Sequence, residues 1–233
     1  VYKRQTKFYV ARATYVPIYG GLDVGLRSVD FSFAYAFSKF VIGMRAQDVG
    51  ADLGEESGGR YAEETFTLSF ARYLNDNIRA GLNLNAYHLQ FPSPFGSGTT
   101  FGIDLGILAH LCTRWRFGFM LENLNQASLK TTDGKEPLPE ALSVGLAFIP
   151  FENAATVFDI RKEPDYPARF VFAQEIAFWN RRLRIRGGIL SEGERFRWSA
   201  GAGFSVMDVT LDYAAIFDPN LPLTHVFGLK YGR

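Results

Sequence analysis

Residues 65–71 read TFTLSFA, and this stretch decides the fold of the chain. Successive side chains of a β-strand point to opposite faces, so Phe66, Leu68 and Phe70 share one side and the threonine, serine and alanine side chains share the other. An α-helix would instead repeat its apolar residues three and four positions apart. The stretch therefore predicts a strand with one apolar and one polar face.

The same alternation continues along the chain, and helical spacing is almost absent. Apolar residues favour every second position in residues 82–84, 101–107, 115–121, 142–148, 183–189 and 196–204. The composition agrees, with 22 Phe, 11 Tyr and 23 Gly but only 10 Pro. We therefore expect an all-β protein.

The connections between these runs alternate between two kinds. Tight turns are expected at residues 38–39, 75–76, 113–114, 150–151, 180–181 and 207–208, and longer polar loops at 17–27, 49–59, 92–98, 130–138, 163–166, 191–194 and 218–221. The runs that they separate number about fourteen, an even count of long antiparallel strands. Short periplasmic turns at one rim and longer extracellular loops at the other are typical of a transmembrane antiparallel β-barrel.

A soluble β-sandwich would show the same alternation, because its apolar face turns to a core instead of to lipid. Strand length favours the barrel, since about 9–11 residues of a tilted strand cross the hydrocarbon layer. Aromatic residues such as Trp115, Trp179 and Tyr231 near the tight turns fit an interfacial girdle. We predict a single barrel domain over residues 1–233, in contact with lipid in the bacterial outer membrane.

Several short segments resemble outer-membrane proteins related to PorV and to the fatty-acid transporter FadL. The matching segments are residues 15–23 (YVPIYGGLD), 31–35 (FSFAY), 68–84 (LSFARYLNDNIRAGLNL), 104–108 (DLGIL), 116–119 (RFGF), 122–125 (ENLN), 138–140 (LPE), 142–147 (LSVGLA), 211–214 (LDYA) and 223–229 (LTHVFGL). The resemblance implies a fourteen-stranded barrel. It also implies a signal peptide and a small N-terminal plug, neither of which is in this sequence. We expect an N-terminally truncated chain whose residues 1–5 (VYKRQ) are artefactual.

Charged residues on the polar faces are the candidate lumen residues. Five arginines could form a basic stripe that attracts anions, or they could pair with carboxylates across the barrel, which is the interpretation we favour. The arginines are Arg182, Arg184, Arg186, Arg195 and Arg197, and the carboxylates are Asp104, Glu122, Glu175 and Asp212.

The last strand carries a second candidate feature. Phe227, Leu229 and Tyr231 alternate close to the C-terminus, which is typical of the signal that the outer-membrane assembly machinery reads. An ordinary closing strand would contain the same residues, and Gly232 and Arg233 follow the aromatic residue that many barrels end on.

No residue pattern points to catalysis. His88, His110 and His225 lack metal-ligand spacing, and Cys112 has no activating partner in the sequence. We expect no catalytic residue, no metal site and no cofactor. A net charge of +1 gives no support to nucleic-acid binding, which needs a basic face.

We expect a non-enzymatic barrel that passes small or hydrophobic molecules across the outer membrane. One alternative is a PorV-like scaffold that holds exported proteins in type IX secretion, and a less favoured one is a soluble β-sandwich binding protein. The expected partners are outer-membrane lipid, the assembly machinery, and either a small hydrophobic ligand or secretion partners.

Overall fold

A computed structural model describes residues 7–18, 26–52, 59–92, 96–131 and 134–232. Its strands are β1 (Lys7–Pro17), β2 (Arg27–Phe37), β3 (Phe40–Asp52), β4 (Arg60–Tyr73), β5 (Ile78–Gln90), β6 (Ser97–His110), β7 (Trp115–Glu122), β8 (Ser128–Thr131), β9 (Gly134–Pro137), β10 (Ala141–Phe151), β11 (Ala154–Lys162), β12 (Arg169–Phe178), β13 (Leu183–Glu192), β14 (Arg195–Val206), β15 (Val209–Asp218) and β16 (Leu221–Gly232). No helix in the described part of the chain is long and apolar enough to span a membrane.

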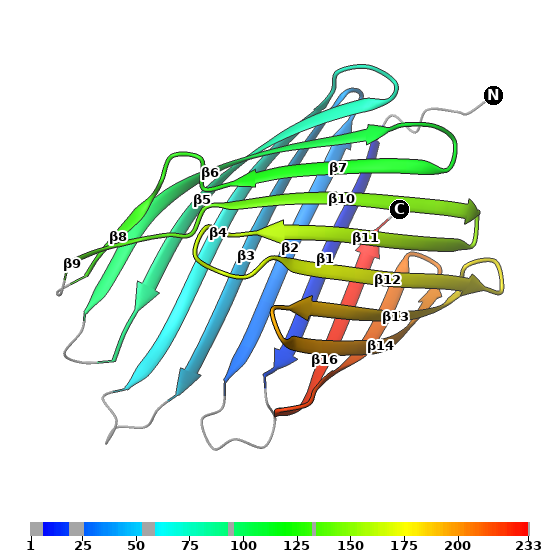
Figure 1. The fold of residues 1–233 in the computed structure, drawn as a ribbon. Coiled ribbons are helices and arrows are strands. Elements are labelled where there is room, and N and C mark those ends of the chain that lie inside the picture. Colours follow the sequence, from blue (N-terminus) through cyan, green and yellow to red (C-terminus); the bar gives the residue numbers. More distant parts are fainter. Residues whose placement is uncertain (1–6, 19–25, 53–58, 93–95, 132–133, 233) are drawn as a thin grey trace.

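Fourteen of these strands close into one barrel, in which neighbours along the wall follow the chain and β16 pairs with β1 (Figure 1). All of these pairs are antiparallel, with β8 and β9 forming a separate two-stranded sheet. Closure gives every wall strand two hydrogen-bonded neighbours, which a strand in hydrocarbon requires. The predicted fold class, a barrel of about fourteen strands, is confirmed, and the β-sandwich alternative is wrong.

The cross-strand register assigns each side chain to the lumen or to the outer face. Thr67 pairs with Asn85 and both are buried inside, whereas the preceding residue, Phe66, is 51% exposed on the outside. On β6, Asp104 is 5% exposed and Phe101 is 68% exposed. The alternation in the sequence is therefore the alternation between a polar lumen and an apolar exterior.

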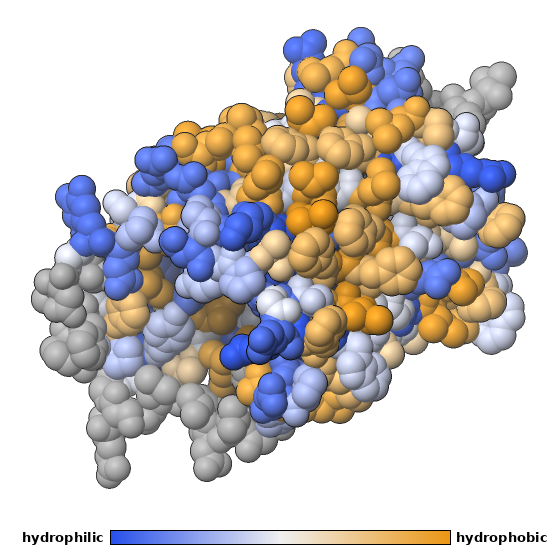
Figure 2. All heavy atoms as spheres, in the orientation of Figure 1, coloured by the Kyte–Doolittle hydropathy of each residue, from blue (hydrophilic) through white to orange (hydrophobic). Residues whose placement is uncertain are grey.

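The apolar exterior identifies the surrounding solvent. Large apolar side chains that stay exposed on the outer face include Phe31, Phe33, Phe66, Phe70, Phe101, Leu105, Phe172, Trp198, Leu211 and Leu229. Figure 2 shows such residues across the middle of the visible wall, with hydrophilic residues gathered toward its ends. Soluble proteins rarely expose contiguous apolar patches larger than a few hundred Å², whereas a transmembrane barrel carries an apolar band around its outer face. Only lipid makes this exterior stable, so the predicted outer-membrane location is confirmed.

The two rims differ from each other, as predicted, but the loop rim is less uniform than expected. We call the end that carries the tight turns, such as residues 38–39 and 207–208, the turn rim, and the opposite end the loop rim. The expected loops at 191–194 and 218–221 are tight turns at residues 193–194 and 219–220. Gly193 has a φ of +59°, and Asp218 Oδ1 accepts a hydrogen bond from Asn220 N at 2.9 Å, so both chain reversals are local.

Two further expectations differ from the structure. Strand β10 runs through Phe151, so the turn predicted at 150–151 lies at residues 152–153. The loop expected at 130–138 contains β9 and the end of β8, which form a hairpin. The expected artefact at residues 1–5 lies outside the described residues.

The β8–β9 hairpin packs against the loop-rim end of β6. Leu129 is 4% exposed, and a Cβ on Gly98 would lie 2.9 Å from Lys130 O, so glycine allows this close approach.

Strand β7 is shorter than its neighbour β6 and leaves part of the edge of β6 without a strand partner. Leu124 N donates to Ile103 O (2.8 Å), and Asn125 supplies an acceptor for Ile103 N (2.9 Å) and a donor for Phe101 O (2.8 Å). An asparagine side chain thus replaces a strand neighbour.

Candidate functional site

The lumen is the candidate functional site, because the inward faces of the strands collect the polar side chains of the molecule. Arg186 on β13 is central to one cluster. Its Nε lies 2.6 Å from Glu175 Oε2 on β12, and its Nη1 lies 2.9 Å from Asp212 Oδ1 on β15. Arg186 reaches Asp212 across β14, where Gly201 and Gly203 leave the space open. Three of the predicted charges therefore come together in one ion-pair network.

A second network lies toward the loop rim. Arg197 Nη2 is 2.9 Å from Glu192 Oε2, and its Nε is 3.9 Å from Asp218 Oδ2. Arg169 also pairs with Glu192, at 2.9 Å. Glu122 pairs with Arg161, which it reaches from β7 across β10. Of the five predicted arginines, only Arg186 pairs with carboxylates that the sequence singled out, and Arg197 pairs with two others. The choice between cross-barrel pairing and a basic stripe therefore stays a prediction.

The other predicted arginines lie elsewhere. Arg184 Nη2 donates to Ser205 Oγ at 3.0 Å, not to a carboxylate. Arg195, at the start of β14, has no side-chain partner among the described residues. Arg182 differs from the expectation, because it lies exposed in the turn before β13 and not on the inward face of a strand.

Asp104 does not pair with an arginine and instead organises a buried amide network. Asn83 and Asn85 donate to its Oδ2 at 3.3 and 2.7 Å, and Asn123 N donates to its Oδ1 at 3.0 Å. Thr67 donates in turn to Asn85 at 2.7 Å. Asn123 is 2% exposed and also binds Ala127 N and Leu138 O, so this network fixes the chain that leaves β7.

The three residues of the proposed assembly signal lie on the outer face of β16. Phe227, Leu229 and Tyr231 are each about half exposed, and their strand closes the barrel against β1. Tyr231 Oη lies 3.5 Å from Tyr9 Oη across that seam. Recognition by the assembly machinery stays a prediction.

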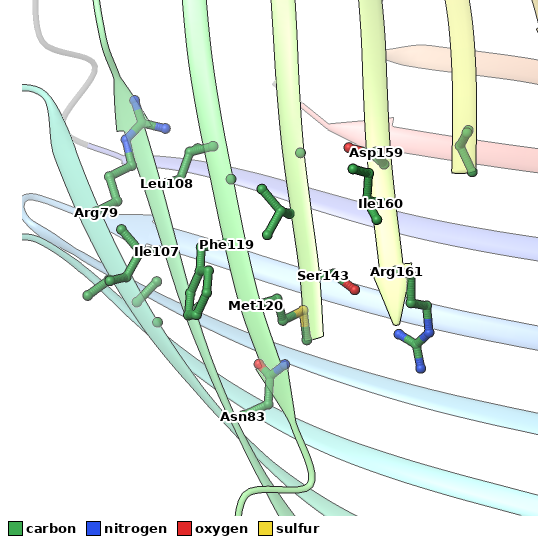
Figure 3. A pocket seen from close by; sticks show the side chains of 18 of the residues that line it. Arg79, Asn83, Ile107, Leu108, Phe119, Met120, Ser143, Asp159, Ile160 and Arg161 are labelled. Carbon is green, nitrogen blue, oxygen red and sulfur yellow. The ribbon is translucent and has the colours of Figure 1, made fainter. Parts of the chain in front are cut away.

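A cavity of about 680 Å³ lies along the inner wall between β5 and β13 (Figure 3). Glycines form part of its surface on adjacent strands, at Gly81, Gly106, Gly118 and Gly145. Apolar side chains from four strands add to it, namely Leu108, Met120, Val171 and Leu190. Its charged lining residues are Arg79, Asp159, Arg161 and Arg169.

Sequence reasoning missed this cavity and its charges. Asp159 and Arg161 stand at alternate positions of residues 154–162 (AATVFDIRK), so the period-2 pattern already placed them on the polar face. The pattern could not predict the register between strands, which brings residues of eight strands, from β4 to β13 along the wall, around one cavity. No group of His, Cys, Asp and Glu able to hold a metal ion occurs among the described residues.

Comparison with known proteins supports the fold. No family model and no curated protein matches the chain. Two similar solved structures are the CymD monoaromatic hydrocarbon channel (TM-score 0.63, 12% identity, 98% of this chain and 88% of that one) and the Pseudomonas putida toluene transporter TodX (TM-score 0.62, 12% identity, 97% and 87%). Neither match singles out PorV. The chain therefore has the fold of outer-membrane hydrocarbon channels.

Proposed function

We propose that this barrel lets small hydrophobic molecules cross the bacterial outer membrane. The observation that carries the proposal is the cavity on the inner wall, where glycines and apolar side chains outnumber charged ones. A water-filled porin has a polar lumen, whereas this part of the lumen offers apolar surface to a solute.

The energetics of transfer support this solute class. An apolar molecule gains about 25 cal/mol for each Å² that it removes from water. The cavity volume of about 680 Å³ lies in the range that binds small molecules, roughly 300–1,000 Å³. The likeness in fold to a toluene transporter and a hydrocarbon channel agrees with an apolar solute. The protein acts here as a conduit, and no chemical step is part of the proposal.

Uptake of labelled toluene by cells tests the proposal. The barrel is expressed in a bacterial host that lacks a comparable channel, and folded barrel is quantified by its heat-modifiable migration. We expect toluene uptake to rise with barrel abundance, and uptake of a sugar of similar size to stay at the level of the empty host. Equal uptake of toluene with and without the barrel would contradict the proposal, and equal entry of both solutes would indicate a general pore.

The protein-export alternative remains a separate hypothesis, and no contact among the described residues favours it. Co-purification of an exported protein with the barrel from its native host tests it.

A further inference from the structure

Two aspartates of the lumen have the same local geometry. Asp212 on β15 lies opposite Gly203 on β14, and Asp159 on β11 lies opposite Gly145 on β10. In both places a Cβ added to the glycine would collide with Oδ1 of the aspartate. Each carboxylate therefore extends over the neighbouring strand, and each glycine provides the space for it.

The two sites differ in what faces the carboxylate. Asp212 Oδ1 lies 2.9 Å from Arg186 Nη1. The carboxylate of Asp159 has no hydrogen-bond or ion-pair partner among the described residues. A half-buried carboxylate is stabilised by a cation or a hydrogen-bond donor, and the matching site shows the arrangement that such a partner takes.

The cationic side chains that line the same cavity already have other partners. Arg161 binds Glu122 and Glu163, and Arg169 binds Glu192. The guanidinium of Arg79 stacks over the ring of Tyr73, with 4.6 Å between its central carbon and the ring centroid. These arginines are therefore held by other groups, and the space beside Asp159 stays open to a solute.

The cavity places an apolar surface beside this carboxylate. Figure 3 shows Asp159 on β11 with its carboxylate directed toward β10, on the same wall as Leu108 and Met120. Gly106 and Gly118 have no neighbouring atom closer than 3.7 Å to an added Cβ, so the wall is open at both positions. A ligand with one charged end and one apolar body would match both features.

We propose that this cavity binds small aromatic ammonium ions, with the ammonium group donating to Asp159 and the ring on the glycine-lined wall. The inference deepens the proposed function, since it names a subsite and a solute class on the same route. It is tested by binding alone, so that it can fail while hydrocarbon passage stands.

Calorimetric titration of the barrel in lipid nanodiscs tests the proposal, with heats from empty nanodiscs subtracted. The probes are benzylammonium, neutral benzyl alcohol and anionic benzoate. We expect benzylammonium to bind at least tenfold more tightly than the other two, because only the ammonium combines a hydrogen bond to the Asp159 carboxylate with an opposite charge. Equal affinity of the three probes, or tighter binding of benzoate, would overturn the proposal.

Two variants locate the effect. Asp159→Asn should weaken benzylammonium binding about tenfold or more. Asp30→Asn is the matched control, because it removes one carboxylate from the Arg45 pair elsewhere in the lumen, and we expect it to change affinity less than twofold. Equal losses of benzylammonium affinity in both variants would mean that the total charge of the lumen controls binding, and would contradict a binding site at Asp159.

A third variant tests the geometry without changing the charge. Gly145→Ala should displace the Asp159 carboxylate and weaken benzylammonium binding several-fold, while benzyl alcohol binding stays the same. Wild-type benzylammonium affinity in this variant would overturn the role of the Asp159–Gly145 arrangement. If benzylammonium fails to bind but toluene uptake persists, only the ammonium site is wrong; absent uptake with intact binding would contradict the passage proposal alone.

Discussion

Single residues in the lumen contribute unequally to stability, and two arginines on adjacent strands illustrate this. Arg186 joins Glu175 and Asp212, whereas Arg195 has no side-chain partner among the described residues. Arg186→Gln leaves two carboxylates without their cation, which should destabilise the barrel. We expect the loss to be only about 1–2 kcal/mol, because the Arg186 guanidinium is partly exposed and water screens its charge. Arg195→Gln should change stability by less than about 0.5 kcal/mol. Urea unfolding in detergent measures both, and equal losses would contradict the network.

Asp104 is the residue on which the buried network depends. Asp104→Ala removes the acceptor of three hydrogen bonds, so the side-chain amides of Asn83 and Asn85 lose the carboxylate to which they donate. We expect a loss of about 3 kcal/mol and faster proteolysis within residues 123–138. Asp48→Ala is the control, since Asp48 pairs with Arg60 at an exposed position and should cost about 0–1 kcal/mol. A small effect at Asp104 would show that the network does not hold this loop.

At the scale of elements, the edge of β6 above the short strand β7 depends on one asparagine. Asn125→Ala removes the acceptor for Ile103 N and the donor for Phe101 O. We expect the Ile103 amide to exchange with solvent at least tenfold faster in hydrogen-exchange mass spectrometry. Gln126→Ala, at the exposed neighbouring position, should leave the exchange unchanged. Unchanged exchange in both variants would mean that β6 is protected in another way.

The strands of the wall could be predicted from the sequence, but the elements outside it could not. Alternation such as that of residues 65–71 depends on the nearest neighbours along one strand, so a single sequence contains it. The β8–β9 hairpin and the Asn125 contacts depend on β6, which is distant in sequence. The same limit holds for the site. The faces of Arg186, Glu175 and Asp212 follow from period 2, but their meeting depends on the glycines of β14 and on the register between strands.

At the scale of the whole molecule, the barrel separates lipid from lumen, and two leucines of β6 test this. Leu105 lies on the outer face and Leu108 lines the lumen cavity. Leu105→Arg should cost about 2–4 kcal/mol, because it places a charge in hydrocarbon. Leu108→Arg should cost less than half as much, because this side chain faces the lumen and not hydrocarbon. Folding into lipid vesicles at increasing urea measures both, and equal costs would contradict the assignment of the two faces.

The central claim, that solutes pass along the lumen wall, is tested most directly by toluene uptake in two glycine variants. Gly118→Phe fills the lumen side and Gly187→Phe adds the same ring to the outer face, and neither position brings an added Cβ closer than 3.9 Å to another atom. We predict that Gly118→Phe lowers barrel-dependent uptake at least fivefold, whereas Gly187→Phe keeps uptake near the wild-type level at equal amounts of folded barrel. Wild-type uptake in Gly118→Phe would contradict passage through the lumen.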